Sequence, residues 1–155
     1  MSSFRDLLAP TMGSDFGDPL RLAALALPDR VKQSPMDWWP LDAMPNGTGN
    51  RLLVGVAVPL GYDLNLLDLL EEAIRGGRGD ALPVGVFDID SLPSLDELER
   101  LLPGIGIVSH TPVVGHWVCG KLKQVASGYQ GRQLVGQLFG FDPQLALERF
   151  VATSG

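Results

Sequence analysis

Residues 110–128 read HTPVVGHWVCGKLKQVASG. Within this stretch, two runs of apolar and β-branched residues, Val113–Val118 and Leu122–Ser127, are separated by a short segment over residues 119–121 that contains a glycine. Two strand-like runs joined by so short a segment are typical of an antiparallel β-hairpin. The sequence therefore predicts a hairpin here, entered directly from the step Thr111–Pro112.

Upstream of the hairpin, strand-like and helix-like patterns alternate. Continuous apolar runs over residues 52–58 and 83–90 predict two buried strands, each followed by leucines at helical spacing. We expect Asp63 to cap the first helix, which ends at Gly76, and a Ser94–Glu97 capping box to open the second. Because strand–helix–strand connections are right-handed crossovers, the two strands should lie parallel in one sheet.

The segments at the two ends of the chain predict further helices. After the hairpin, Arg132–Phe139 has a helical pattern, and Asp142 with Pro143 is expected to cap a last helix through Leu145, Leu147 and Phe150. Residues 1–50 contain six prolines and are interpreted as an N-terminal extension with short helices. In this extension a helix over Leu20–Leu27 is expected to end at Pro28, and the following loop carries Trp38 and Trp39.

The order strand, helix, strand, helix, hairpin, helix resembles the core of the thioredoxin superfamily. The closest likeness lies between His110 and Gly128, where Thr111–Pro112 precedes the hairpin, and Val86–Asp90 resembles the family's strand that ends in an acidic residue. The resemblance covers residues 51–140. It implies a thioredoxin-like three-layer α/β/α sandwich over residues 51–155, with a mixed sheet of parallel strands and a C-terminal antiparallel hairpin. It also implies a cis peptide bond before Pro112.

The chain departs from the redox members of that family at the start of the first helix. Those members carry Cys-x-x-Cys there, and a gap-free alignment of residues 53–70 puts Gly61 and Leu64 at the two positions. The single cysteine, Cys119, falls in the hairpin turn, about 20 Å from Pro112 along an extended strand. Because thiol exchange needs a sulfur nucleophile, we expect no catalytic residue and no dithiol chemistry.

Without dithiol chemistry, the resemblance still implies a surface that binds an extended segment of another protein. In the family the residue before the cis-proline, here Thr111, presents its backbone to an extended peptide, as in strand addition. We therefore expect a non-catalytic adaptor or assembly chaperone, a class that includes cysteine-free thioredoxin-like proteins assisting assembly of metalloenzymes such as hydrogenase. The expected binding residues are His110, Thr111, Pro112, Pro59, Gly61, Tyr62, Asp63, Tyr129, Trp38 and Trp39.

Two other classes of function stay open. One is a thiol- or glutathione-dependent enzyme of the same superfamily, which would need a nucleophile near Gly61. The other is a structural subunit of a larger assembly, and a homodimer formed through the N-terminal extension is a related possibility.

The composition and the motifs of the chain narrow the classes of ligand that it is expected to bind. A formal charge of −6, without a run of basic residues, argues against nucleic acid. The longest apolar stretch, Leu52–Leu60, is shorter than the roughly 20 residues of a membrane helix, and the N-terminus lacks a signal-peptide core, so we expect a cytoplasmic protein that does not bind membranes. No nucleotide-binding or nucleophile-elbow motif appears. His110 and His116 lie about 20 Å apart along a strand, so at most His116 and Cys119 could share a metal ion, which is fewer than the three or four protein ligands of a zinc site. We expect neither cofactor nor metal.

Overall fold

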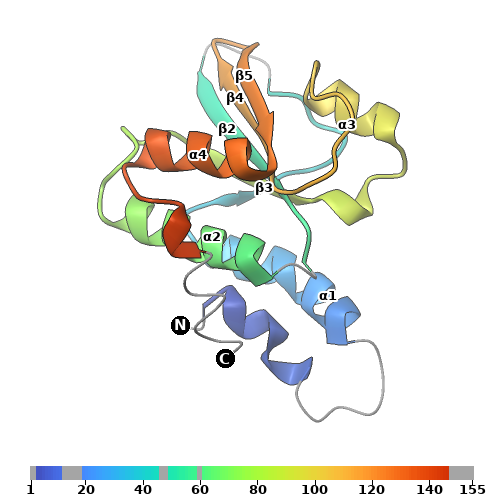
Figure 1. Cartoon of the computed structure of the whole chain (residues 1–155), viewed down its shortest axis with the longest axis vertical. Coiled ribbons are helices and arrows are strands. Elements are labelled where there is room, and N and C mark those ends of the chain that lie inside the picture. The colour runs from blue at the N-terminus through green and yellow to red at the C-terminus, as the bar shows by residue number, and fades with distance from the viewer. Residues whose placement is uncertain (1–2, 12–18, 46–48, 59–60, 147–155) are drawn as a thin grey trace.

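The computed structural model describes residues 3–11, 19–45, 49–58 and 61–146. These residues form an α/β structure built on one five-stranded mixed sheet in the order β1-β3-β2-β4-β5 (Figure 1). The strands are β1 (Asp37–Trp38), β2 (Asn50–Val56), β3 (Val84–Asp88), β4 (Val113–Val118) and β5 (Lys121–Ser127). Strands β1, β3 and β2 are mutually parallel, whereas β4 runs antiparallel to both β2 and β5.

The helices follow the strands in the alternating order that the sequence predicts. They are the 3-10 helices η1 (Arg5–Thr11) and η2 (Ile89–Ser91) and the α-helices α1 (Pro19–Lys32), α2 (Gly61–Arg75), α3 (Leu95–Leu101) and α4 (Gly128–Phe139). None of the helices within these described ranges has the length and apolar character needed to cross a lipid bilayer.

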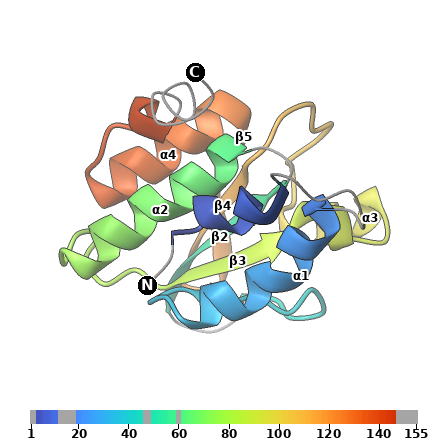
Figure 2. The same cartoon turned by 90° about the horizontal axis from the view of Figure 1, so that it is seen from below.

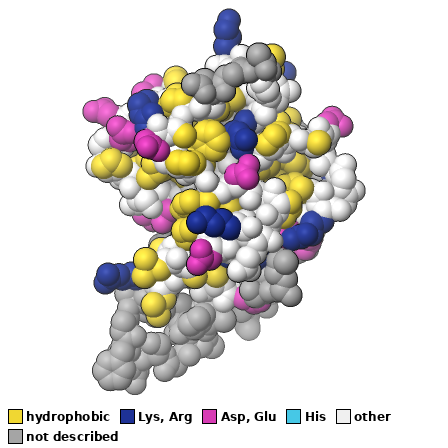
Figure 3. Space-filling view, turned by 180° about the vertical axis from the view of Figure 1, so that it is seen from behind, with side chains coloured by type: hydrophobic (Ala, Val, Ile, Leu, Met, Phe, Trp, Pro, Cys, Tyr) yellow, Lys and Arg dark blue, Asp and Glu magenta, His cyan; other side chains and the backbone are white. Residues whose placement is uncertain are grey.

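Two apolar clusters form on the two faces of the sheet. Alternate residues of β2 point to opposite faces, so Leu52 and Val54 pack with residues of α1, α2 and α4, whereas Leu53 packs with residues of α3. Helices therefore cover both faces, as two perpendicular views show (Figures 1 and 2). On the described part of the face in Figure 3, charged side chains of both signs are mixed with apolar ones.

The predicted hairpin is confirmed. Strand β4 has the predicted bounds and β5 begins one residue earlier than expected, at Lys121. The turn consists of Cys119 and Gly120, which both have positive φ values, 53° and 78°. Positive φ at both central residues is the geometry of a two-residue type I′ turn, which matches the twist of the flanking strands. The Thr111–Pro112 peptide bond is cis, as expected.

The N-terminal region differs from the sequence expectation in two ways. Helix α1 does not end at Pro28 but continues through it to Lys32. Proline removes one backbone donor, but the turn beyond it buries Val31 and Arg30, and this packing outweighs the lost hydrogen bond. Trp38 lies in strand β1 and not in a loop, and β1 pairs with β3 at the edge of the main sheet.

Smaller differences concern helix ends. Helix α4 starts at Gly128, four residues before the predicted Arg132. The Ser94 side chain caps α3 by accepting from the backbone N–H of Glu97 at 3.4 Å, as predicted. Asp142 accepts from the backbone N–H of Gln144 at 2.9 Å, which is a capping contact, but the predicted continuation through Leu147 and Phe150 lies outside the described residues.

Candidate functional site

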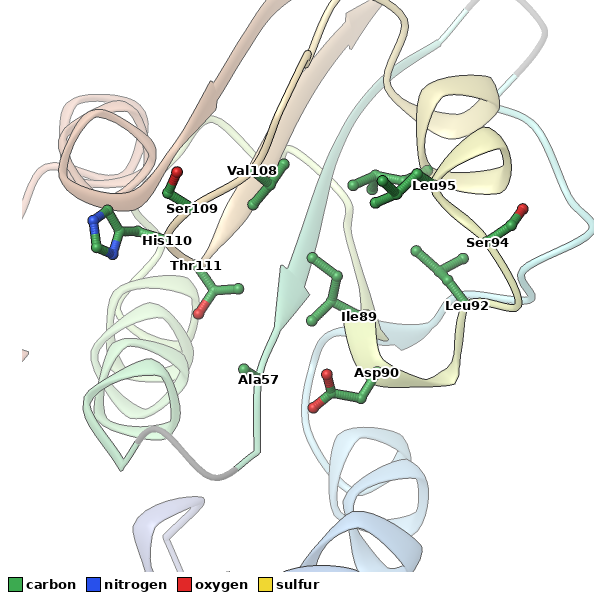
Figure 4. Close-up of a pocket in the computed structure, with 11 residues that line it drawn as sticks. Ala57, Ile89, Asp90, Leu92, Ser94, Leu95, Val108, Ser109, His110 and Thr111 are labelled. Atoms are coloured by element: carbon green, nitrogen blue, oxygen red, sulfur yellow. The ribbon is translucent and has the colours of Figure 1, made fainter.

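A largely apolar cavity of about 470 Å³ opens beside the entry to β4. It lies between the η2–α3 segment and the loop that leads from α3 to Thr111 (Figure 4). Its size falls within the range of known ligand pockets, roughly 300–1,000 Å³. The lining residues are Ala57, Ile89, Asp90, Leu92, Ser94, Leu95, Leu98, Val108, Ser109, His110 and Thr111.

Two capping contacts position the apolar wall of this cavity. Asp88, the last residue of β3, accepts from the backbone N–H of Asp90 at 2.9 Å and so turns the chain into η2. Burial raises the pKa of Asp88, against the smaller opposing effect of this hydrogen bond. Ser94 then starts α3. As a result Leu92 and Leu95 lie across the cavity from Val108 and Thr111 (Figure 4).

The opposite wall is a loop whose backbone is available for hydrogen bonding. Residues 106–110 form no helix or strand, and among the described residues their backbone N–H and C=O groups have no hydrogen-bond partner. Ile107 in this loop is 94% exposed. Unpaired backbone groups beside an apolar cavity can hydrogen-bond to an extended peptide whose side chain enters the cavity.

Behind the loop, Asp63 is a fully buried carboxyl in the first turn of α2. Its Oδ2 atom accepts from the backbone N–H of Ala57 at 3.0 Å, so Asp63 ties α2 to the end of β2 instead of capping its own helix as expected. Burial raises the pKa of Asp63 to about 6, although Ala57, Thr111 and Arg132 each act to lower it. Within the described ranges, neither Oδ1 of Asp63 nor the Thr111 hydroxyl has a hydrogen-bond partner of good geometry.

Thr111 itself is buried, which corrects the expectation that its backbone is presented at the surface. Only 8% of the residue is exposed, and its carbonyl accepts from Nη1 of Arg132 at 3.4 Å. The exposed backbone belongs to the loop residues that precede it.

Gly61, at the first position of α2, lies directly under the guanidinium of Arg5. A Cβ atom at this position would collide with that guanidinium. The start of α2 is therefore covered by the N-terminal segment. That segment is held in place by Asp68, which accepts from the backbone N–H groups of Phe4 and Arg5 at 2.6 and 3.1 Å.

Two of the binding residues expected from the sequence line the cavity. Thr111 and His110 line the cavity, and His110 packs against Gly128, where α4 begins. Pro112 is buried behind them, Tyr62 is half-buried at the start of α2, and Tyr129 is 63% exposed in the first turn of α4. Pro59 lies outside the described residues.

Trp38 and Trp39, which the sequence predicts as lining residues, lie in and next to the edge strand β1. Trp38 packs against the core on one face of the sheet and Trp39 against the core on the other. Trp39 also donates through Nε1 to the carbonyl of Ala43 at 3.1 Å. Neither residue lines the cavity, because β1 is the edge strand farthest from β4 in the sheet order.

Sequence reasoning missed the aliphatic residues that form the cavity. Leu95, taken as part of the apolar face of a helix, is 76% exposed, whereas Leu98 is buried beneath it. Arg132, which hydrogen-bonds to Thr111, was also not predicted from the sequence as a residue of the site. The spacing of Ile89, Leu92 and Leu95 does not distinguish a cavity wall from a core, because the pattern of apolar residues does not show what packs opposite them.

Cys119 and His116 lie away from this site. Cys119 is exposed in the hairpin turn at the far end of β4, as expected. His116 is buried in β4, and burial followed by the charge of Lys123 lowers its pKa. Among the described residues, no cluster of three or more His, Cys, Asp or Glu side chains could hold a metal ion.

Comparison of the sequence with protein-family models and with curated proteins finds no match.

Proposed function

We propose that this chain is a redox-inactive, thioredoxin-like binding protein, an adaptor or assembly chaperone, that holds an extended segment of a partner protein at the cavity beside Thr111. The parallel β1-β3-β2 unit followed by the antiparallel β4–β5 hairpin supports the thioredoxin-like assignment. Gly61, where the redox members carry cysteine, supports the lack of dithiol chemistry.

The single observation that carries the proposal is the pairing of an apolar cavity with an unpaired loop backbone. An extended segment that hydrogen-bonds to residues 106–110 would direct alternate side chains toward the cavity, because successive side chains of a strand point to opposite sides. A cavity of about 470 Å³ has room for one large aliphatic or aromatic side chain. Main-chain pairing then provides affinity, and the cavity provides selectivity.

The alternative of a thiol-dependent enzyme has less support. The lone thiol lies at the end of β4 opposite the cavity, and Gly61 is covered by Arg5. A glutathione-transfer assay on the wild type and on Cys119→Ser tests it directly. Turnover that the substitution abolishes would replace the adaptor proposal by the enzyme.

The binding proposal is tested by selecting a random peptide library on the immobilised wild-type protein and on Leu95→Glu. This substitution puts a carboxylate on the wall of the cavity at a side chain that is already 76% exposed, so it should leave the fold intact. Leu25→Glu on α1, at a leucine that is 66% exposed, is the matched control. We expect peptides with a large apolar side chain to be enriched on the wild type and on the control but not on Leu95→Glu. Equal enrichment on all three proteins would refute the proposed site.

A further inference from the structure

Arg132 is a half-buried cation that hydrogen-bonds to Thr111, a residue of the cavity wall, without itself lining the cavity. It lies in the second turn of α4, and its guanidinium is 5.2 Å from the centre of the Tyr62 ring. Its Nη1 atom donates to the Thr111 carbonyl at 3.4 Å. Since Thr111 also lines the cavity, a single residue separates the guanidinium from it. Figure 4 shows Thr111 and His110 on the side of the cavity that faces α2 and α4.

This guanidinium has no carboxylate partner in the described part of the chain. The four ion pairs there involve Arg30, Arg51, Arg75 and Arg100. Asp63 is close enough for Arg132 to influence its titration, but the two groups form no ion pair. Arg132 also hydrogen-bonds to the Tyr62 side chain, and its bond to the Thr111 carbonyl is long, so some of the five guanidinium N–H donors remain available.

The neighbours of Arg132 orient the guanidinium without neutralising it. The Tyr62 ring packs beside it, and the Thr111 carbonyl holds one nitrogen. A guanidinium held in this way loses little further freedom when it binds a carboxylate through two parallel hydrogen bonds. The acidic residue that lines the cavity itself is Asp90, which belongs to η2 (Figure 4). The site therefore has a negative side and a positive side.

We infer that Arg132 recognises a carboxylate on the bound segment, next to the apolar side chain that fills the cavity. The inference rests on the proposed function and specifies its ligand as an extended peptide with an apolar anchor and an acidic group within a few residues of it. The opposite charges of Asp90 and Arg132 would also set the direction in which the segment lies. The carboxylate belongs either to an Asp or Glu side chain or to the C-terminus of the partner.

Two formats of the random peptide library distinguish these sources. In one format the peptides are fused at both ends, and in the other they end in a free carboxylate. Enrichment of Asp or Glu in both formats identifies a side-chain carboxylate. Enrichment confined to the free-ended format, at a fixed distance from the apolar residue, identifies a C-terminus. Apolar peptides enriched without any acidic group would overturn the inference and leave the proposed function standing, whereas no enrichment on the wild type would remove both.

A double-mutant cycle on the most enriched peptide tests the role of Arg132. Its carboxylate is replaced by the matching amide, and affinity is measured for the wild type and Arg132→Met by fluorescence anisotropy. We expect each single change to weaken binding about tenfold or more. The double change should weaken binding little further, because either single change already breaks the same hydrogen-bonded charge pair. Arg132→Lys should bind with intermediate affinity, because it keeps the charge but loses the planar fork.

Arg51→Met is the matched control. Arg51 also lies beside an aromatic ring, 4.8 Å from the centre of Trp39, but at the start of β2, where it pairs with Trp117 and not with the entry to β4. Its removal should leave peptide affinity unchanged. The amide substitution in the peptide needs no folded variant, so the test remains decisive even if Arg132→Met unfolds. Additive losses in the cycle, or an amide peptide that binds as tightly as the acid, would refute recognition by Arg132.

Discussion

Replacing Asp63 by Asn should stabilise the protein at neutral pH and not at acidic pH. The Asp63 carboxyl is fully buried, and burial raises its pKa from 3.8 to about 6. At about 1.4 kcal/mol per pKa unit, this difference corresponds to about 3 kcal/mol. Asn is nearly isosteric, carries no charge and can still accept the hydrogen bond from Ala57 through its amide oxygen.

The pH range follows from the direction of the shift. A carboxyl whose pKa is higher in the folded state than in the unfolded state favours folding when it is protonated. That contribution is fully present below about pH 4 and is lost as the pH rises through about 6. The free energy of unfolding of Asp63→Asn should therefore match the wild type near pH 4 and exceed it by about 2–3 kcal/mol above pH 7.

Urea denaturation of both proteins at a series of pH values measures this difference. Comparison with Asp63→Asn cancels the contributions of other titrating groups, including Asp68 and Asp88, whose pKa values burial also raises. Asp42→Asn, at an exposed carboxylate, is the control and should change stability by less than about 0.5 kcal/mol. A stability difference for Asp63→Asn that does not vary with pH would refute the argument that an unfavourable buried charge is removed.

Two further substitutions, each with a matched control, test tight packing and a buried ion pair away from the cavity. Gly136→Ala should destabilise the protein by about 1–3 kcal/mol in thermal melts, despite the higher helix propensity of alanine. The reason is that the added methyl group would lie 2.6 Å from a backbone carbonyl of the segment after α4. Gly49→Ala, which has open space around it, is the control and should be nearly neutral. Glu71→Ala should cost about 3–5 kcal/mol in chemical denaturation, since it leaves the buried Arg30 guanidinium without its 2.6 Å ion pair. Arg75→Ala removes the more exposed ion pair that Glu71 forms and should lower stability by no more than about 1 kcal/mol. Equal losses of stability for Glu71→Ala and Arg75→Ala would contradict the argument that the buried pair with Arg30 matters more.

The order of secondary structure was determined by the sequence itself, because its signals are local. The two strand-like runs on either side of Gly120 predict the hairpin, and the glycines after residue 75 end α2 where expected. Two continuous apolar runs predict strands that are buried on both faces, and β2 and β3 are such strands and lie parallel. These features depend on neighbouring residues along the chain, so they can be deduced without knowing the rest of the fold.

Other features depended on what the tertiary structure places opposite each residue. Helix α1 continues past Pro28, and Trp38 becomes part of an edge strand, because burial against the sheet outweighs local preference. The burial of Asp63 and the closeness of Arg132 to Thr111 are likewise set by contacts between α2, α4 and the β4 entry. The cavity forms where α3 and the loop before Thr111 do not pack against each other. The periodicity of apolar residues in the sequence does not predict such a space between two segments.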